Sequence, residues 1–379
     1  MTTDTRNGAR SRILHVIIML GETNGQYNEH CLPLMHERDI SIVTYFVPQL
    51  TPPPAITLFP GDGTLRGFFR ALRAALERGG YDVIHVHAPQ TGGLVTLATL
   101  GRGRFRAVRR SLVYTVQDSF HDYRARDRLL MVLCLLSFRR VVFCSRSALE
   151  SVPGPLARAI RDRARVVPNG FDLDRVDRAI ADRPGPRSSG FTVISVGRLQ
   201  PVKDPSSVVD AFAAALGDDR TARLVFVGAG PLAGSIAARA QALGVGDRVE
   251  LTGLIPRDEV YRLCADADVF ISASHGEGLP VAVLEAMAAR CPAILSDIPP
   301  HREVADGSDL IRFVREGDVE GFAEGLRRIR ALTPQERRAL GDRGREHVAA
   351  RFTLSVMRAG TDAVYREVGP QRTDLVGRP

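Results

Sequence analysis

Tryptophan is absent from this chain of 379 residues, and long apolar runs are absent as well. No stretch approaches the about 20 apolar residues that a membrane-spanning helix needs. Residues 1–12 are polar and lack the pattern of a secretory signal peptide. These absences argue against a membrane-spanning or secreted protein, so the sequence predicts a cytoplasmic location.

Cysteine is scarce and irregularly placed. The chain has five cysteines, an odd number, and no pair has the Cys-x-x-Cys spacing of a redox or zinc motif. They are Cys31, Cys134, Cys144, Cys264 and Cys291. Neither a disulfide framework nor a metal site is expected, and we interpret these residues as small buried hydrophobic side chains.

Lysine is almost absent. The chain has 51 lysine and arginine residues in total, and Lys203 is the single lysine among them. An ammonium group is a compact point charge that suits a phosphate oxygen, whereas guanidinium is a planar fork. Lys203 also comes soon after the apolar run 191–196. We therefore interpret it as a candidate phosphate ligand; the alternative is a chance occurrence on the surface, where most lysines lie.

Positive charge is concentrated in one segment. The net charge is +8, and residues 101–165 contain 15 arginines against five acidic residues. Nucleic acid or an anionic membrane could bind such a segment, but no aromatic interleaving or nucleic-acid motif accompanies it. We expect no nucleic-acid partner and at most weak peripheral membrane contact, with solvated arginine-rich faces as the alternative. The apolar run 129–136 favours a buried helix over an interfacial one.

Apolar, β-branched runs alternate with helical patterns along the whole chain, which is typical of parallel sheets covered by helices. The predicted strands are 13–20, 40–46, 83–86, 111–116, 141–144, 165–167, 191–196, 222–227, 248–252, 269–272, 293–295 and 311–314. A Pro-, Gly- and Ser-rich stretch at 182–190 indicates a linker. The length and this division predict an α/β protein of two Rossmann-like domains, residues 1–183 and 190–350.

The segment 274–288 has the pattern of an anion-binding helix start. Pro280 fits the first helical position, so the preceding loop, with Gly278 and Leu279, would present free backbone N–H groups. Glu285 lies five residues further, where its carboxylate could reach ribose hydroxyls while the helix end holds a pyrophosphate. Glu277 lies in the loop itself. The alternative is that both glutamates only complement the helix dipole.

Several motifs occur in a recognisable order along the chain. They are His-Val-His at 85–87, Val-Pro-Asn-Gly-Phe-Asp at 167–172, Gly-Arg-Leu at 197–199 followed by Lys203, Phe-Val-Gly-Ala-Gly-Pro-Leu at 226–232, Leu-Thr-Gly-Leu-Ile at 251–255, Gly-Glu-Gly-Leu-Pro at 276–280 with Glu-Ala-Met-Ala at 285–288, and Ser-Asp-Ile-Pro-Pro-His-Arg-Glu at 296–303. As a set they resemble the retaining nucleotide-sugar glycosyltransferases of family 4. That family has the GT-B fold, two Rossmann-like domains with parallel sheets facing across a cleft.

The resemblance implies a role for each donor-site residue. Arg198 and Lys203 would clamp the diphosphate, Glu277 would contact the donor sugar and Glu285 the ribose. The remaining donor-binding residues would be Gly197, Gly230, Gly253, Ile255, Gly278, Leu279 and Pro280, with Ile255 beside the base. Because these protein cations would neutralise the leaving group, neither a metal nor a cofactor is expected.

The resemblance also implies substrates and a third segment. Residues 351–379 would form a helix that crosses back to the N-terminal domain, followed by a tail. The donor would be a UDP sugar, with GDP as the alternative. For the acceptor we expect a hydroxyl of a specialised metabolite such as an aminocyclitol, as in antibiotic biosynthesis in bacteria, and the alternative is a polysaccharide or lipid-linked glycan intermediate.

The N-terminal domain would bind the acceptor through residues that follow its strands. These are Gly21, Asn24, Gly25 and Gln26 after the first strand, His87 after a later one, and Gln117. Family members commonly carry a histidine at the position of Gln117, and glutamine cannot transfer a proton. The loop also lacks the double glycine of many relatives, which weakens the role of Gly21.

Two other classes of function remain open at this point. Gly228-Ala229-Gly230 after a predicted strand imitates a dinucleotide fingerprint, so an NAD- or FAD-dependent oxidoreductase is an alternative. A non-catalytic basic binding module is another. Asp172-Leu173-Asp174 and Asp266-Ala267-Asp268 imitate a metal motif, but we interpret them as helix caps and solvated acids.

Overall fold

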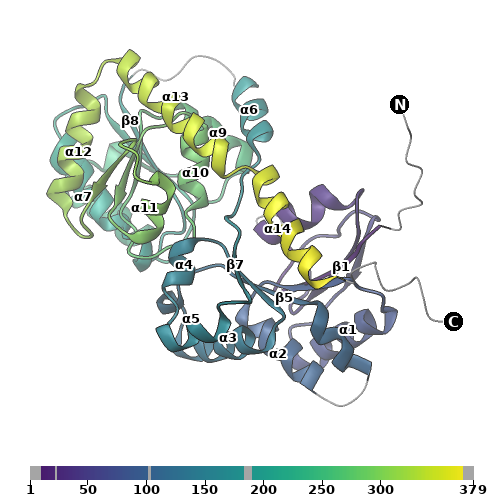
Figure 1. The fold of residues 1–379 in the computed structure, drawn as a ribbon. Helices are drawn as coiled ribbons and strands as arrows, with labels where there is room; N and C mark the ends of the chain where they lie inside the picture. Colours follow the sequence, from purple (N-terminus) through teal and green to yellow (C-terminus); the bar gives the residue numbers. More distant parts are fainter. Residues whose placement is uncertain (1–9, 22–23, 101–103, 183–189, 370–379) are drawn as a thin grey trace. The chain divides into compact units, whose positions relative to one another are not determined.

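The computed structural model describes residues 10–21, 24–100, 104–182 and 190–369. The chain forms two compact units, one of residues up to Pro168 together with those from Met357, and one of Asn169–Val356 (Figure 1). In the described part of the chain, every helix is too short or too polar to cross a membrane.

The first unit is a parallel sheet of seven strands in the order β3-β2-β1-β4-β5-β6-β7. The strands are β1 Arg12–Ile17, β2 Asp39–Thr44, β3 Ile56–Phe59, β4 Val83–Val86, β5 Leu112–Val116, β6 Arg140–Phe143 and β7 Ala164–Val166. The connecting helices are η1 Gln26–Cys31, η2 Leu32–Leu34, α1 Leu65–Arg78, α2 Pro89–Leu100, η3 Arg104–Ser111, η4 Phe120–Asp122, α3 Ala125–Ser137, α4 Arg146–Glu150 and α5 Gly154–Ile160.

The second unit is a parallel sheet of six strands in the order β10-β9-β8-β11-β12-β13. The strands are β8 Thr192–Val196, β9 Arg223–Val227, β10 Val249–Leu251, β11 Val269–Ser272, β12 Ala293–Ser296 and β13 Ile311–Val314. The helices are α6 Leu173–Ala181, η5 Pro201–Lys203, α7 Pro205–Leu216, α8 Ala233–Ala242, η6 Gly246–Arg248, α9 Arg257–Asp266, α10 Val281–Ala288, α11 Pro299–Ala305, α12 Val319–Ala331 and α13 Pro334–Arg351, and α14 Leu354–Val368 follows.

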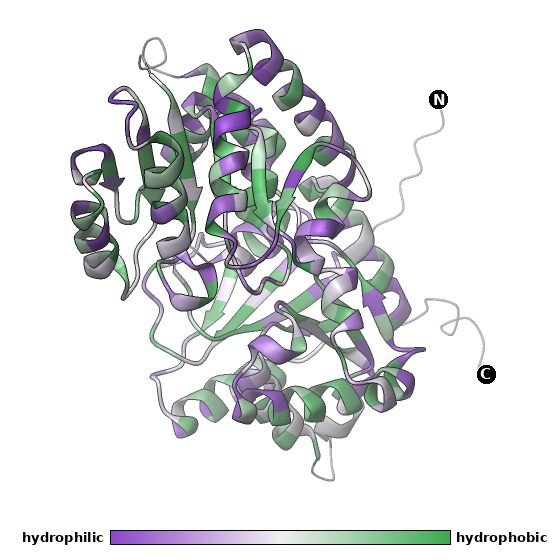
Figure 2. Cartoon of the chain, turned by 90° about the vertical axis from the view of Figure 1, so that its left-hand side faces the viewer, coloured by the Kyte–Doolittle hydropathy of each residue, from purple (hydrophilic) through white to green (hydrophobic). Residues whose placement is uncertain are grey.

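These two units confirm the predicted α/β fold class with parallel sheets. The strands are rich in β-branched and aromatic residues and are mainly hydrophobic in Figure 2, because helices cover both faces of each sheet. Strand β3 was not predicted. It is four residues long, lies at the sheet edge, and follows three consecutive prolines, so neither length nor alternation distinguishes it from a loop.

The chain passes between the units earlier than the predicted boundary at residue 183. Helix α6 lies in the second unit, where Nε of Arg262 on α9 donates to the carbonyl of Ala179 at 3.0 Å, and Arg175 forms an ion pair with Asp258 at 2.5 Å. Residues 183–189 of the linker predicted at 182–190, and the tail after 369, lie outside the described residues. Asp172 accepts a hydrogen bond from the backbone N–H of Arg175, which confirms that it caps a helix.

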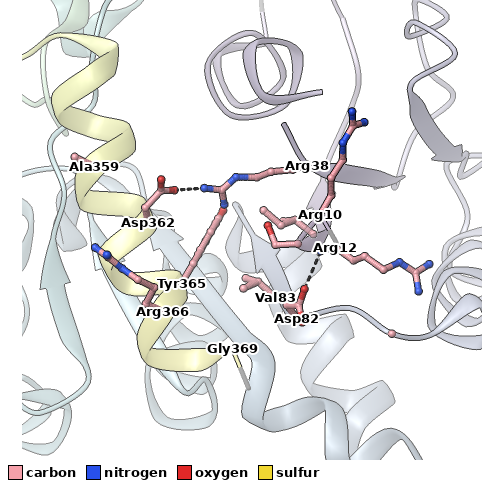
Figure 3. A pocket seen from close by; sticks show the side chains of 13 residues that line it. Arg10, Arg12, Arg38, Asp82, Val83, Ala359, Asp362, Tyr365, Arg366 and Gly369 are labelled. Atoms are coloured by element: carbon pink, nitrogen blue, oxygen red, sulfur yellow. Dashed lines mark hydrogen bonds and ion pairs between the residues drawn. The ribbon is translucent and has the colours of Figure 1, made fainter. Parts of the chain in front are cut away.

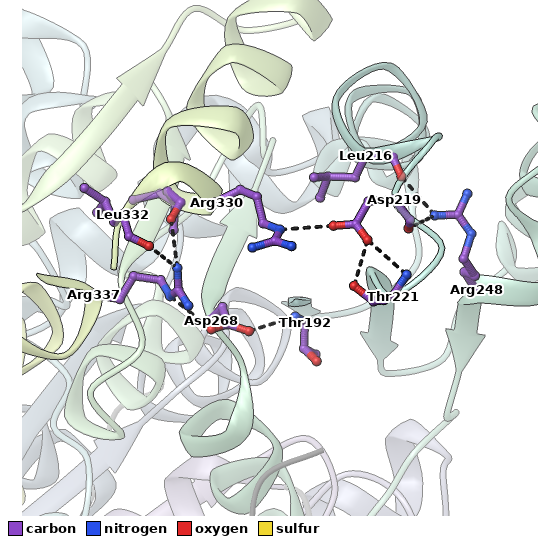
Figure 4. A network of polar contacts seen from close by, with 10 residues as sticks. Thr192, Leu216, Asp219, Thr221, Arg248, Asp268, Arg330, Leu332 and Arg337 are labelled. Atoms are coloured by element: carbon purple, nitrogen blue, oxygen red, sulfur yellow. Dashed lines mark hydrogen bonds and ion pairs between the residues drawn. The ribbon is translucent and has the colours of Figure 1, made fainter. Parts of the chain in front are cut away.

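Buried and half-buried charges hold the base of the second sheet together (Figure 4). The buried guanidinium of Arg248 donates to the carbonyls of Leu216, Gly217 and Asp219, at and just after the end of α7. Asp268 accepts from the backbone N–H of Thr192 and pairs with Arg337 at 3.1 Å. These contacts fasten the amino ends of β8 and β11, so the opposite edge is held in register.

Candidate active site

The predicted donor-site residues all follow the carboxyl ends of strands in the second sheet. Arg198 and Lys203 follow β8, whereas Glu277 follows β11. In the strand order β10-β9-β8-β11-β12-β13, β9 and β10 are added on one side of β8 and β11 to β13 on the other, and ligands of open α/β sheets bind outside the carboxyl ends of the strands at such a switch point. The backbone N–H of His275 donates to the carbonyl of Val202 at 2.8 Å and ties the two loops together.

Lys203 and Glu277 are in direct contact. Nζ of Lys203 lies 2.5 Å from Oε2 of Glu277, and both side chains are largely buried. Lys203 was predicted to bind the diphosphate and Glu277 the donor sugar, so these two predicted ligands lie at one place. Arg198 precedes Lys203 by five residues, and its side chain is exposed. Among the residues that the structure describes, its guanidinium has no acidic partner. It is available for an anion.

Helix α10 begins one residue later than expected. Pro280 was predicted to be its first residue, which is wrong, because the ψ of Pro280 is 79° and the helix starts at Val281. No described side chain caps its first turn. Gly278, Leu279 and Pro280 are buried and lead into this helix end. The uncapped start retains the positive dipole end that suits a phosphate.

Glu285 is buried in α10 and is held by two residues that the sequence analysis missed. Its Oε1 accepts hydrogen bonds from Nε and Nη2 of Arg257 at 2.9 and 2.5 Å and from the Tyr261 hydroxyl at 2.9 Å. Burial and the neighbouring Glu285 charge raise the pKa of Tyr261, so the phenol remains a donor. Arg257 lies two residues after Ile255, which was predicted to lie beside the base. This proximity was the sequence signal that could have pointed to Arg257.

Close backbone contacts explain the two glycines after β9. A Cβ on Gly230 would lie 2.2 Å from the carbonyl oxygen of Leu199, and one on Gly228 would lie 2.1 Å from that of Gly197. Gly253 has a φ of 69° and accepts a hydrogen bond from Gly228. The loops thus interlock at the donor edge of the sheet, which accounts for the Gly-x-Gly pattern without a dinucleotide turn.

His301 is a further residue that the sequence analysis did not select. It lies in α11 after β12, is fully buried, and its Nδ1 is 2.8 Å from the carbonyl oxygen of Ser296. Its Nε2 has no hydrogen-bond partner within the described chain. Burial lowers the pKa of His301, while the charge of Glu277 opposes this shift and that of Lys203 adds to it. This neutral imidazole therefore lies within electrostatic range of the Lys203–Glu277 pair.

In the first unit, the loop after β1 is stabilised by its own side chains. Nδ2 of Asn24 donates to the carbonyl of Met19 at 3.0 Å, and its Oδ1 accepts from the backbone N–H of Tyr27 at 2.8 Å. Gly25 and Gln26 follow at the start of η1, and Gly21 precedes it. Asn24 thus shapes the loop, and acceptor binding by these four residues stays a prediction.

His87 belongs to a cluster of buried histidines at the middle of the first sheet. Ligand atoms of His15, His85 and His87 lie within 4.8 Å of one another, a spacing at which three imidazoles could hold a metal ion. Both nitrogens of His85 are engaged, however, Nδ1 with the Tyr365 hydroxyl at 2.7 Å and Nε2 with Thr115 at 2.6 Å. We assign no metal to the cluster, and the absence of a metal requirement stays a prediction.

Nδ1 of His87 is buried without a hydrogen-bond partner in the described residues, and its Nε2 lies 3.0 Å from Nδ1 of His15. Burial, followed by the charges of the neighbouring histidines, lowers the pKa of His87 well below its usual value, so it is neutral. Gln117 follows β5, and its carbonyl accepts from the Cys144 thiol at 3.2 Å. His121, four residues after Gln117, is exposed in η4.

A cavity of about 820 Å³ lies elsewhere, at the amino ends of β1 and β4 beside α14 (Figure 3). Its arginines are partly neutralised, because Arg12 pairs with Asp39 at 2.9 Å and Arg38 pairs with Asp362 at 2.5 Å. Loops that carry function in parallel sheets follow the carboxyl ends of strands. The cavity is at the opposite edge and is not part of the candidate site.

Comparison with family models covers almost the entire described chain. Residues 15–175 match the model described as Glycosyltransferase Family 4, and residues 177–347 match Glycosyl transferases group 1. This chain belongs to glycosyltransferase family 4. It is a glycosyltransferase with two parallel-sheet domains of the GT-B type, and the oxidoreductase and non-catalytic alternatives are set aside.

Relatives of this glycosyltransferase include EpsD of Bacillus subtilis, a protein named as a glycosyltransferase, which is 26% identical over 78% of both chains. The alpha-monoglucosyldiacylglycerol synthase of Streptococcus pneumoniae is 27% identical over 62% of this chain and 56% of its own. The UDP-Gal:alpha-D-GlcNAc-diphosphoundecaprenol alpha-1,3-galactosyltransferase of Escherichia coli is 25% identical over 78% of this chain and 77% of its own.

Solved structures share the fold across the chain. Sucrose-phosphate synthase from Thermosynechococcus elongatus superposes with a TM-score of 0.75 at 20% identity, covering 94% of this chain and 99% of its own. HepE of Anabaena, solved with UDP and glucose, has a TM-score of 0.75 at 14% identity, covering 94% of this chain and 100% of its own. At these identities the likeness establishes the fold alone.

Proposed function

We propose that this glycosyltransferase moves a hexosyl or aminohexosyl group from a nucleoside diphosphate sugar to an acceptor hydroxyl, with UDP as the favoured nucleotide and GDP next. One observation carries the proposal. Lys203 and Glu277 meet after β8 and β11, where the strand order of the second sheet switches from one side of β8 to the other, and the exposed Arg198 precedes Lys203 by five residues. A cation for the diphosphate and a carboxylate for sugar hydroxyls are thereby within one hydrogen bond of each other.

The proposed chemistry requires stabilisation of a leaving diphosphate. As the bond between the sugar C1 and the diphosphate oxygen breaks, negative charge grows on that oxygen. Arg198, Lys203 and the uncapped start of α10 supply positive charge there, which lowers the barrier because the attraction increases as charge develops. Lys203 would exchange its contact with Glu277 for the phosphate, freeing Glu277 for the sugar. A metal is not required for this neutralisation.

We propose that the product retains the anomeric configuration of the donor. In a front-face reaction the acceptor oxygen bonds to C1 on the side from which the diphosphate departs. The acceptor proton passes to the departing phosphate oxygen, so no protein nucleophile is needed. Isolation of a glycosylated enzyme would contradict this step.

For the acceptor, the names of the relatives favour the second of the two sequence-based alternatives. One relative is named for diacylglycerol and another for a diphosphoundecaprenol glycan. We therefore propose an acceptor in polysaccharide or lipid-linked glycan assembly. The aminocyclitol acceptor stays a prediction, and a panel of both acceptor kinds would separate them.

Thermal unfolding in the presence of nucleotides tests the proposal without knowledge of the acceptor. A ligand present at 100 times its Kd stabilises the folded state by about 2.7 kcal/mol, so UDP or GDP should raise Tm measurably. EDTA should change neither this shift nor turnover. Turnover that is abolished by EDTA and restored by Mn²⁺ would contradict the metal-independent mechanism, and no shift with any nucleotide would contradict the donor site.

A further inference from the structure

Helices α2 and α3 of the first unit expose leucines that a solvated surface does not require. Leu97 and Leu100 on α2 and Leu129 and Leu136 on α3 have between 50% and 71% of their surface exposed. Leucines are usually buried, and exposed apolar groups that lie together mark contact surfaces. We call these four residues the leucine face.

Helices α2 and α3 pack against each other, and the four leucines of the leucine face remain exposed despite this contact. A Cβ on Gly92 would lie 2.5 Å from Sγ of Cys134, and one on Gly93 would lie 2.8 Å from a methyl carbon of Leu130. The small residues of α2 thus let α3 pack closely on that side. The outward side of α3 carries Leu129, the half-buried Leu133 and Leu136, one stripe at helical spacing.

Positive charge surrounds the leucine face. Helix α2 has no charged residue, and the one acid of α3, Asp127, is buried. Arg124 and Arg139 flank α3, Arg128 lies in its first turn, and Arg110 lies in η3 next to α2. Within the described residues none of these four guanidinium groups has an acidic partner. The part of the chain that the structure describes therefore leaves their charge uncompensated.

We propose that the leucine face and its arginines form a docking surface for an anionic lipid bilayer. Leucines can enter the boundary between head groups and acyl chains, while arginines remain at the level of the phosphates. A second protein could cover the leucines, but the partner would also have to neutralise the arginines, and a negatively charged membrane does both with one surface. The docking surface lies entirely within the first unit.

The consequence for function is a membrane-bound acceptor. The enzyme would then meet a lipid-linked glycan acceptor at the membrane on which it docks. This consequence rests on the proposed function. The docking itself does not, because vesicle binding requires neither donor nor turnover. Failure to bind vesicles alongside nucleotide stabilisation would overturn the docking surface alone, whereas the opposite pair of results would overturn the proposed donor site alone.

Cosedimentation of the full chain with lipid vesicles tests the proposal. We expect binding to vesicles rich in phosphatidylglycerol, little binding to pure phosphatidylcholine, and release as salt shortens the screening length below about 10 Å. Removing one arginine near an anionic surface weakens binding about fivefold, so Arg128→Gln with Arg139→Gln should weaken it roughly 30-fold. Leu129→Ser with Leu136→Ser should weaken it at least about tenfold.

Matched variants control for charge and apolar surface in general. Arg220→Gln with Arg223→Gln removes the same charge from exposed positions of the second unit, and Leu243→Ser removes an exposed leucine there. Both should bind vesicles as the parent chain does, and all variants should keep the parent Tm. Equal losses in test and control variants, or no binding to anionic vesicles at low salt, would overturn the proposal. So would a dimer that the leucine substitutions dissociate in the absence of vesicle binding.

Discussion

At the residue scale, the proposed function rests on Lys203. The sequence singled it out as the one lysine of the chain. The structure shows in addition that its ammonium group lies 2.5 Å from the carboxylate of Glu277 and that its side chain is only partly exposed. A lysine held in this way is pre-oriented, because its flexible stem has lost most of its freedom before the donor arrives. Arg198 supplies a second, exposed cation. The two differ in chemistry, so their replacements should differ in effect.

Replacing Lys203 by alanine should lower kcat by about 10² to 10³, or about 3 to 4 kcal/mol, because its attraction to the diphosphate increases as the leaving group gains charge. Lys203→Arg should restore little, since the planar guanidinium does not fit the place of an ammonium beside Glu277. Steady-state kinetics with a nucleotide sugar measures both effects.

The control for this experiment is the double variant Lys203→Ala with Glu277→Gln. If Lys203 acts on the diphosphate, adding its removal to Glu277→Gln should lower kcat further. If Lys203 only orients Glu277, the double variant should be no slower than Glu277→Gln alone. That second result would remove Lys203 from the reaction.

The sequence predicted Lys203 and Glu277 because their residue types stand out locally. It could not predict Arg257 and Tyr261, which hold Glu285 from a different helix, because nothing in sequence spacing reports which loop packs beside α10. His301 was missed for a related reason. A single histidine in a sequence gives no sign that it will be buried with one nitrogen unpaired.

At the scale of elements, the central strands could be predicted from the sequence, whereas the edge strand β3 and the unit to which α6 belongs could not. Central strands such as β1 and β8 are mostly apolar and rich in isoleucine and valine, as expected for a parallel sheet that is covered on both faces. The edge strand β3 pairs on one side only, so its composition is less constrained. Helix α6 was placed with the wrong domain for a similar reason, since its packing on α9 is a long-range contact.

The end of α7 provides a test at this scale. Replacing Arg248 by methionine should lower the free energy of unfolding by about 2 to 4 kcal/mol, because the carbonyls of Leu216, Gly217 and Asp219 lose a buried charged donor. Urea unfolding followed by circular dichroism measures the change. Arg223→Met, at an exposed position, should change it by less than about 0.5 kcal/mol. Equal stability of both variants would contradict this role of Arg248.

At the scale of the whole molecule, the buried histidines of the first unit predict acid sensitivity. Burial lowers the pKa of His15 to about 3 and of His30 to about 4, and it lowers those of His85 and His87 well below 6.5. The unfolded chain therefore binds protons that the folded chain does not. Stability is complete above about pH 6.5 and falls as pH decreases, by up to about 1.4 kcal/mol per pH unit for each histidine.

Urea unfolding between pH 7 and pH 5 measures this dependence, with circular dichroism as the probe because the chain has no tryptophan. His30→Gln removes one titrating group and should make the dependence shallower, whereas His121→Gln, at an exposed position, should leave it unchanged. A midpoint that does not move between pH 7 and pH 5 would show that the buried histidines are protonated in the folded protein.

The fold as a whole could be predicted because length, alternating pattern and motif order agree. The donor site could be predicted in part, since parallel strands bring their following loops to one edge and the motifs lie in those loops. The identity of the acceptor could not be predicted, because the loop after β1 is shaped by Asn24 and by contacts that no sequence motif records.

Labelling of the single lysine tests the central claim most directly. Apart from the α-amine, Lys203 is the only amine that an acylating reagent can modify, so intact mass reports its state. We predict that saturating UDP or GDP protects Lys203, that free sugar does not, and that Glu277→Gln accelerates labelling by releasing the ammonium group. Equal labelling with and without nucleotide, in an enzyme that keeps its activity after modification, would contradict the donor site.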